Sequence, residues 1–264
     1  MRQSNLMLHC GSEPKSVKVI EAVPTPERTE SWVPIPHGKL LSTVRETLTS
    51  QGLQVVTEAH ALAKDGLRYF GLLQVNNGTE DGDFGLVVGV RNSHDKSFPA
   101  GLVLGASVFV CDNLSFSGEV KLARKHTAKI EADLPLLVDR AVGLLGNLRM
   151  SQAERFDRYQ HFDISDLQAH DLVVRALDDG VIGCTHVPRV VQEWRHPSHP
   201  EFIQSGKTAW RFFNAVTEVL KGGLNQLPRR TQALHGLLDT AVGLTVPAIP
   251  FRSEDAEIQV ANAV

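Results

Sequence analysis

The chain contains few cysteines, few aromatic residues and no long apolar run. Its three cysteines among 264 residues are far apart and odd in number, which argues against a disulfide framework and favours a reducing compartment. No apolar stretch approaches the roughly 18 residues of a membrane-spanning helix, and the first ten residues lack the pattern of a signal peptide. We therefore expect a cytoplasmic protein that has no membrane partner.

A strong charge of either sign is also missing. The 27 Lys and Arg residues against 30 Asp and Glu residues give a formal net charge of −3, which offers no general attraction to phosphate backbones. Any contact with nucleic acid would therefore have to come from a local patch of positive charge.

Familiar catalytic and metal-binding motifs are absent as well. The sequence has no phosphate-binding glycine-rich loop, no nucleophile elbow of serine hydrolases and no His-Glu-x-x-His zinc motif. Two short pairs of Cys and His come nearest to a zinc set, but the gap between them matches no closed zinc site. The residues of these pairs are Cys184, His186, His196 and His199. We therefore predict no bound metal and no cofactor.

The composition is that of a folded globular protein, with 42% hydrophobic and 22% charged residues. Its length suits one large domain or two small ones. Five prolines and little periodicity at the start of the chain predict an extended N-terminal arm over residues 1–35. We place a single domain over 36–245 and a C-terminal tail over 246–264.

Signals for strands dominate the first half. A helical stripe of leucine and valine predicts a helix over 37–51, before the strands begin. The pair Asp65-Gly66 between two apolar runs is a strong hairpin signal and predicts two antiparallel strands. Two further apolar runs, 84–90 and 102–110, predict two more strands, and the first of them is expected at the centre of the sheet.

Helical spacing dominates the second half, after residue 130. Serine followed three residues later by Glu or Gln, at Ser151 and Ser165, predicts two helix starts. Apolar stripes that begin at Trp210 and after Pro228 predict two more helices. Strands followed by helices, without alternation, indicate an α+β fold in which helices from the second half pack on an antiparallel sheet from the first half.

The polar segment 91–97 is the first candidate site, because it places an imidazole, a carboxylate, hydroxyls and cations between two apolar strands. Loops on a rigid sheet often carry function. The same residue types also favour turns that bind nothing, so a turn remains the alternative. The candidate residues are Arg91, Asn92, Ser93, His94, Asp95 and Ser97.

Cys111 is the second candidate, since a thiol and a histidine are the minimal set for nucleophilic catalysis. An enzyme of this kind would use His94, Asp95 and Cys111, and the alternative is a cysteine buried as a small hydrophobic residue. The chain from 99 to 111 covers roughly 40 Å as a strand and roughly 18 Å as a helix. We therefore predict that His94 and Cys111 do not form a catalytic pair within one chain.

A short basic stretch is the third candidate. Between residues 121 and 129 the chain has four cations and His126 but no acidic residue, which suits a few phosphates of a nucleic acid. The alternative is a solvated surface. Binding of a single strand would also need aromatic residues for stacking. The cations are Lys121, Arg124, Lys125 and Lys129, and the aromatic candidates are Tyr69, Phe70, Phe98 and Phe116.

Several of these residues, with others downstream, resemble a known family. The residues are Asn92-Ser93-His94-Asp95-Lys96-Ser97, then Val110-Cys111-Asp112-Asn113-Leu114, and later Trp210, Phe213-Asn214, Thr217-Glu218 and Lys221-Gly222-Gly223. In order and spacing they are similar to the phage/plasmid-like family called domain of unknown function 932, over about residues 32–238. Lys96 stands where that family commonly has glycine, so a left-handed turn there is expected to be strained.

The resemblance implies a protein carried by phages, plasmids or prophages that acts in the cytoplasm of the host, and it brings no established catalytic residue. Three functional classes fit that context. The first is a protein that handles single-stranded DNA in replication or recombination. The second is an interaction protein that blocks a host defence factor, and the third is a thiol or histidine enzyme that uses the Asn-Ser-His-Asp loop. The sequence carries no signal for an oligomeric state.

Overall fold

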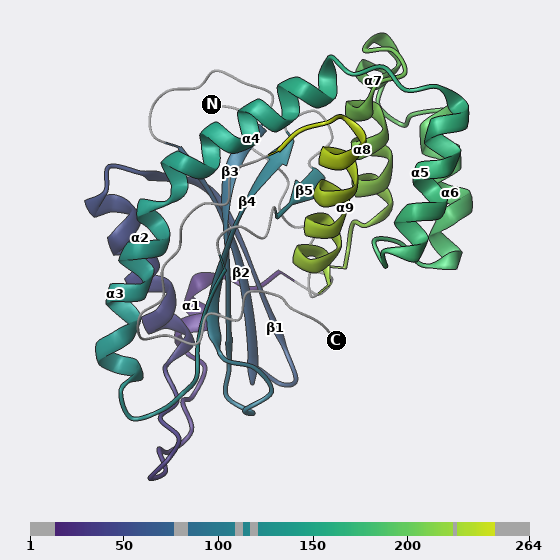
Figure 1. Ribbon diagram of the computed structural model, residues 1–264. Coiled ribbons are helices and arrows are strands. Elements are labelled where there is room, and N and C mark those ends of the chain that lie inside the picture. Colours follow the sequence, from purple (N-terminus) through teal and green to yellow (C-terminus); the bar gives the residue numbers. More distant parts are fainter. Residues whose placement is uncertain (1–13, 77–83, 109–112, 117–120, 224–225, 246–264) are drawn as a thin grey trace.

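The computed structural model of the chain describes residues 14–76, 84–108, 113–116, 121–223 and 226–245. In this part of the chain six strands form one antiparallel sheet, and helices lie on either side of it (Figure 1). The strands come from the first half and most of the helices from the second, so the predicted α+β fold is confirmed. The strands are β1 (Gln54–Ala63), β2 (Arg68–Asn76), β3 (Phe84–Ser93), β4 (Ala100–Val108), β5 (Asn113–Ser115) and β6 (Lys121–Arg124).

The strands follow one another across the sheet in the order β1-β2-β3-β4-β5, and β6 pairs with the other end of β4. The hairpin predicted at Asp65-Gly66 joins β1 and β2, and both residues have positive φ, 54° and 89°, as a type I′ turn requires. Strand β3 lies between β2 and β4 and is buried along nearly its whole length, so the predicted central strand is also confirmed.

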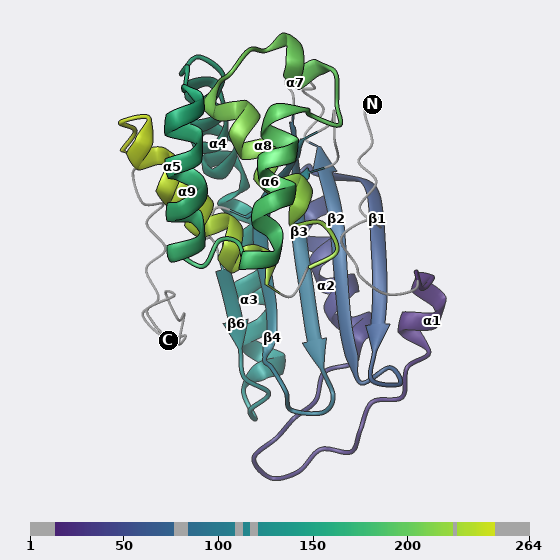
Figure 2. The same cartoon turned by 90° about the vertical axis from the view of Figure 1, so that its right-hand side faces the viewer.

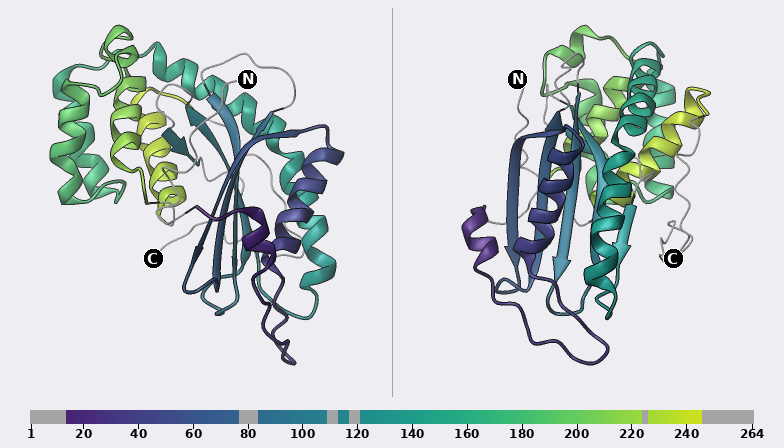
Figure 3. Two further views of the ribbon diagram at one scale, coloured as in Figure 1. Left: turned by 180° about the vertical axis from the view of Figure 1, so that it is seen from behind. Right: turned by 90° about the vertical axis from the view of Figure 1, so that its left-hand side faces the viewer.

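Side chains alternate along β3 and enter two separate cores. Val88 and Val90 face the first core, which is built with α2 and α3, and Val87 faces the second, built with the later helices. Figure 3 shows α2 and α3 side by side against the sheet. The helices are α1 (Val17–Glu21), α2 (His37–Ser50), α3 (Ile130–Gly143), α4 (Leu145–Gln160), α5 (Asp166–Asp178), α6 (Val187–Arg195), α7 (Glu201–Gln204), α8 (Ala209–Val219) and α9 (Leu227–Ala241).

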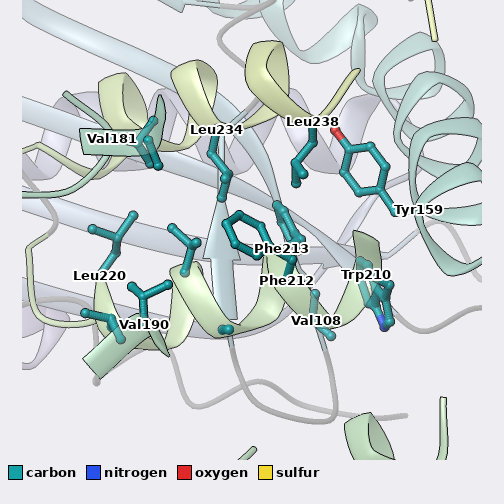
Figure 4. Packing of buried hydrophobic residues seen from close by; sticks show 14 of the residues in the cluster. Val108, Tyr159, Val181, Val190, Trp210, Phe212, Phe213, Leu220, Leu234 and Leu238 are labelled. Atoms are coloured by element: carbon teal, nitrogen blue, oxygen red, sulfur yellow. The ribbon is translucent and has the colours of Figure 1, made fainter. Parts of the chain in front are cut away.

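Helix α8 is the centre of the second core and is buried on all sides (Figure 4). The hydroxyl of Thr208 accepts a hydrogen bond from the Arg211 N–H at 3.3 Å and so caps its first turn. The ring of Trp210 stacks on that of Phe213, with centroids 5.4 Å apart, and both contact Phe156 of α4. These aromatic contacts join α4 to α8 and build the core on which the helical half of the fold depends.

The two predicted capping boxes have different outcomes. Ser165 caps α5 as expected, since it accepts from the Gln168 N–H and the Gln168 side chain reaches back to the Ser165 N–H. The helix start predicted at Ser151 is wrong, because α4 begins six residues earlier, at Leu145. Within that helix the Ser151 hydroxyl donates to the Leu148 carbonyl at 3.1 Å, a local bond that makes serine compatible with a helix interior.

The described part of the N-terminal segment lies along the sheet. Pro14 pairs with Ala61 at the outer side of β1, and the Lys15 N–H donates to the His60 carbonyl at 2.9 Å. After the short helix α1 the chain passes the lower end of the sheet as a loop before α2 begins (Figure 1). Residues 1–13 and the predicted tail, 246–264, lie outside the described residues.

Gly105 in β4 gives a testable consequence of the close approach between β4 and the residues at the end of β5. A Cβ atom at this position would overlap the backbone oxygen of Ser115 and the ring of Phe116. We expect Gly105→Ala to lower the free energy of unfolding by about 1–3 kcal/mol, as overpacking does, which urea denaturation measures. Gly146→Ala is the control, because α4 leaves that position open, and alanine there should stabilise the helix slightly. Equal unfolding midpoints for Gly105→Ala and the wild type would contradict the expected clash.

Candidate functional site

The Asn-Ser-His-Asp segment lies at the lower end of β3, where the chain turns toward β4 (Figure 2). Strand alternation directs Asn92 and His94 toward α2, and Arg91 and Ser93 toward the opposite face of the sheet. The His94 N–H donates to the Leu67 carbonyl at 2.7 Å and so joins this segment to the hairpin turn. The segment therefore contributes side chains to two surfaces: one is buried under α2, and the other lies on the opposite face of the sheet.

Asn92 is the centre of the buried surface. Its Nδ2 donates to the Ile35 carbonyl at 2.7 Å and to His37 Nδ1 at 2.9 Å, and its Oδ1 accepts from His126 Nε2 at 2.8 Å. Since His37 Nδ1 accepts, the His37 proton sits on Nε2, which donates to the Gly66 carbonyl at 2.9 Å. These bonds also place the His126 proton on Nε2. We call His37, Asn92, His94 and His126 the histidine–asparagine cluster.

His94 completes this cluster. Its ring stacks on that of His37, with centroids 3.8 Å apart and planes within 6°, and its Nε2 donates to the Ile35 carbonyl at 2.9 Å. Its Nδ1 is buried and has no hydrogen-bond partner among the described residues. Burial, with a smaller contribution from His94, lowers the pKa of His37 and of His126 to about 4. Both rings are therefore neutral at pH 7.

A second buried polar chain continues from the cluster across β2 and β1. The ring of Tyr69 lies 5.5 Å from that of His37, and its hydroxyl is 3.0 Å from His60 Nδ1. His60 Nε2 lies 3.5 Å from a carboxylate oxygen of Glu58, and Arg45 of α2 donates to the same carboxylate. His60, against the effect of burial and together with Arg45, lowers the pKa of Glu58 to about 2. Glu58 and Arg45 stand at the outer end of this chain, where they pair with each other.

The structure does not join His94 and Asp95 into a catalytic pair. Asp95 Oδ2 accepts from Arg68 Nε at 2.6 Å, and its Oδ1 accepts from the Ser97 N–H at 3.1 Å. Although burial opposes the shift, the bonds from Ser97 and Arg68 lower the pKa of Asp95 to about 2. Asp95 thus closes the loop and pairs with β2, while the His94 ring is held by the backbone of Ile35.

Of the later motif residues, Asn113 lies away from the histidine–asparagine cluster, in β5. Cys111 is outside the described residues, so its separation from His94 stays a prediction. Strand β4 leads away from the cluster, since Gly101 pairs with Arg91 near the lower end of β3 and Val108 pairs with Phe84 at the upper end. Asn113 follows in β5 at that upper end.

Asn113 lies at the junction of β5 with the helical half. Its Nδ2 is 3.2 Å from both the carbonyl and the side-chain oxygen of Asn214 in α8. Both asparagines are buried, and both belong to the residues that carry the family resemblance. The motif therefore divides into two places at opposite ends of the sheet, and at this one it attaches β5 to α8.

The basic stretch is smaller than the sequence indicates. Arg124 forms an ion pair with Asp133, which α3 brings next to it. His126 is buried in the histidine–asparagine cluster and adds nothing to the surface. Lys125 and Lys129 are exposed. Lys121 pairs with Val103 in the strand register, and its side chain is outside the description.

Only two of the four aromatic candidates can meet a ligand. Tyr69 and Phe116 are fully buried, at 0% exposure, so the expectation that they stack on bases is wrong. Phe70 and Phe98 are half-buried on the face of the sheet opposite α2, with ring centroids 5.5 Å apart. The guanidinium carbon of Arg91 lies 5.4 Å from the Phe98 centroid. We call Phe70, Arg91 and Phe98 the aromatic–arginine surface.

Arg91 differs from the neighbouring arginines because it has no acidic partner among the described residues. In the part of the chain that the structure describes, its contact with Phe98 is not accompanied by a hydrogen bond or an ion pair. Burial lowers the pKa of Arg91, because the partly buried charge loses solvent without gaining a counter-charge. Arg68 and Arg124, by comparison, are each paired with an aspartate.

Lys96 adopts the left-handed turn that the motif predicts, with φ of 61°. Such a conformation costs a non-glycine residue about 1–2 kcal/mol. The Lys96 ammonium lies 4.8 Å from the centroid of the Trp32 ring, a cation–π contact that offsets part of this cost. The lysine thereby anchors the segment before α2 to the loop.

Two of the four residues considered for zinc have other partners. His186 Nδ1 accepts from the Gly183 N–H at 3.1 Å, and His199 Nε2 lies 3.5 Å from a carboxylate oxygen of Glu218. Among the described residues, no three side chains of His, Cys, Asp or Glu are grouped as ligands for a metal ion.

Comparison with known families shows to which family this α+β chain belongs. The family model of a domain of unknown function, DUF932, matches residues 26–259, and the chain belongs to this family. No curated protein and no solved structure matched the chain. None of the described helices is long and apolar enough to cross a membrane.

Sequence reasoning found the loop 91–97 but missed two members of the cluster behind it. The sequence places His37 only at a helix start and His126 only in a basic stretch. Strand phase could have indicated the buried surface, because Asn92 and His94 continue the alternation of Val88 and Val90, which face the first core.

Proposed function

We propose that this protein binds single-stranded DNA in the replication or recombination of a mobile element, and that the aromatic–arginine surface is the contact. The observation that carries this proposal is Arg91, a partly buried guanidinium that stacks on Phe98 and has no acidic partner in the described chain. The mobile-element context rests on the family resemblance.

The chemistry of this surface suits a single strand. Aromatic rings stack with any base, and a guanidinium donates to phosphate oxygens in a planar, forked geometry. A duplex keeps its bases stacked inside, so Phe70 and Phe98 would offer it little. An unpaired arginine also gains more from an anionic ligand than one that must first leave a carboxylate.

Two further cations lie near the same end of the sheet. Arg124 pairs with Ala100 at the start of β4, two residues after Phe98, and Lys125 and Lys129 follow it. Lys129 directly precedes α3, on the other face of the sheet, and Arg124 is engaged by Asp133, so Arg91 is the cation of the aromatic–arginine surface and would neutralise about one phosphate. A slope of log affinity against log salt of about −0.7 is expected for this contact, at ~0.7 per phosphate of a single strand.

The other two classes have less support. A thiol or histidine enzyme would need Asp95 to orient His94, and Asp95 instead pairs with Arg68. A protein that blocks a host factor would need a docking surface, for which the described residues offer no comparable observation.

Fluorescence anisotropy with a labelled 20-nucleotide oligo(dT) tests the proposal. Arg91→Gln is expected to weaken binding at least tenfold, because a hydrogen bond to a charged group contributes about 1.5–3 kcal/mol. Phe98→Leu should weaken it by a similar factor through the loss of base stacking. Arg175→Gln makes the same charge change on α5, far along the chain, and should leave affinity unchanged. Absence of wild-type binding at micromolar protein and low salt, or unchanged binding by both surface variants, would refute the proposal.

A further inference from the structure

A single buried hydroxyl fixes the backbone of Phe98. Ser93 Oγ donates to the Phe98 carbonyl at 2.6 Å and accepts from the Phe98 N–H at 3.2 Å. Ser93 has 0% exposure, so water cannot replace either bond. Pro99 follows Phe98 and restricts the backbone of the preceding residue to extended conformations. The hydroxyl and the proline therefore fix the place of Phe98 from two sides.

The loop between Ser93 and Phe98 is closed by a second tie. Asp95 accepts from the Ser97 N–H within the loop and from Arg68 Nε in β2. Arg68 stands directly opposite Ser93 in the register of β2 and β3, so this tie holds the loop next to the strand from which it leaves. The Asn-Ser-His-Asp motif thus supplies both ties, one through its serine and one through its aspartate.

The ring that these ties hold is not part of a core. Neither Phe98 nor Phe70 belongs to the two hydrophobic cores that the described residues form. Figure 2 shows that the helices of the second half lie over the upper part of this face of the sheet, above the lower ends of β2 and β3. A fixed loop therefore holds a half-buried ring that stabilises neither core, and such a ring is available to a ligand.

Arg91 is placed beside this ring by the strand opposite it. Gly101 pairs with Arg91 in the register of β3 and β4. A Cβ atom at Gly101 would lie 3.4 Å from Arg91 Nε and 3.7 Å from its Cγ, so the arginine side chain lies across the glycine. Its guanidinium carbon is 5.4 Å from the Phe98 centroid. A ring for one base and a guanidinium for one phosphate therefore stand side by side.

We propose that Ser93 is a positioning residue of the aromatic–arginine surface, and that this surface takes one unpaired nucleotide. The base of that nucleotide stacks on Phe98, and its phosphate meets Arg91. Ser93 touches neither of them and acts only through the backbone of Phe98. The nucleotide rests on the proposed function, whereas the positioning of Phe98 can be measured without DNA.

An abasic strand separates the base from the phosphate in the test. Ser93→Ala removes both bonds to Phe98 and leaves Arg91 in place, so it should weaken binding of the labelled oligo(dT) by about fivefold or more, as expected for a lost base stack. A labelled 20-nucleotide strand without bases should be bound equally by Ser93→Ala and the wild type. Ser42→Ala, at an exposed serine of α2, is the matched control and should leave both affinities unchanged. Pro99→Ala loosens the same backbone and should show the same difference between the two strands, so it gives a second test if Ser93→Ala is poorly folded.

The NMR signals of the Arg91 side chain report the same geometry in the free protein, because an aromatic ring shifts the signals of protons over its face. Ser93→Ala should move the Arg91 Cδ proton signals toward those of an arginine without a ring contact. Unmoved signals, or equal binding of oligo(dT) by Ser93→Ala and the wild type, would overturn the inference, while the effect of Phe98→Leu would still support the proposed function. Equal losses with both strands would also overturn it, because they would indicate damage to the fold. If the wild type binds neither strand, the proposed function and the nucleotide fail together, and the Arg91 signals still decide the role of Ser93.

Discussion

Replacing Asn92 with leucine is expected to lower the free energy of unfolding by about 3–5 kcal/mol and the thermal midpoint by about 10 °C. Leucine has a similar shape but no polar atoms. The change would leave His37 Nδ1 and the His126 Nε2–H buried without a partner, at about 1–3 kcal/mol each, and would remove the bond to Ile35. The Ile35 carbonyl would still accept from His94.

Asn147→Leu is the matched control for this prediction. Asn147 is exposed on α4, so the same chemical change should alter stability by no more than about 0.5 kcal/mol. Urea denaturation and thermal melts of both variants give the comparison. An Asn92→Leu protein that melts within about 2 °C of the wild type would mean that the cluster contributes little to the fold.

The sheet could be predicted because its signals are local. Asp65-Gly66 has the residue types of a type I′ turn, and the apolar run 84–90 is too short for a helix and too uniform for a strand with one wet face. Neither inference needs a distant partner. The capping pattern at Ser151 mispredicts the start of α4 for the same reason, because it is local and takes no account of the buried residues Leu145 and Leu148 that precede it in the same helix.

The histidine–asparagine cluster could not be predicted from spacing. Asn92 is 55 residues from His37 and 34 from His126, and only the packing of α2 and of the segment after β6 brings the three together. The ion pair that reduces the charge of the basic stretch could not be predicted for a similar reason. Its acidic partner, Asp133, lies four residues past the stretch, and the turn into α3 returns it to Arg124.

The two histidines that bond to the Asn92 side chain, His37 and His126, are expected to make the stability of the fold sensitive to mild acid. His37 and His126 have a pKa of about 4 in the folded protein and about 6.5 when unfolded, so between these values the unfolded chain binds more protons. Stability should therefore fall as the pH falls from 6.5 to 4. Each ring should cost about 2 kcal/mol at pH 5, relative to pH 7, and about 3 kcal/mol at pH 4.

Urea denaturation at pH 7 and pH 5 measures this loss apart from the carboxylates. Glu58 has a folded pKa of about 2, so its contribution is lost only below about pH 4.5. His126→Gln retains an N–H donor for Asn92 but cannot titrate, so its loss between pH 7 and pH 5 should be about 2 kcal/mol smaller than that of the wild type. His161→Gln, at an exposed ring, should leave the wild-type loss unchanged. If His126→Gln loses as much stability as the wild type, the cluster cannot be the source of the acid sensitivity. A smaller loss in His126→Gln alone would show that the neutral imidazoles around Asn92 couple protonation to the attachment of α2 and its preceding segment to the sheet.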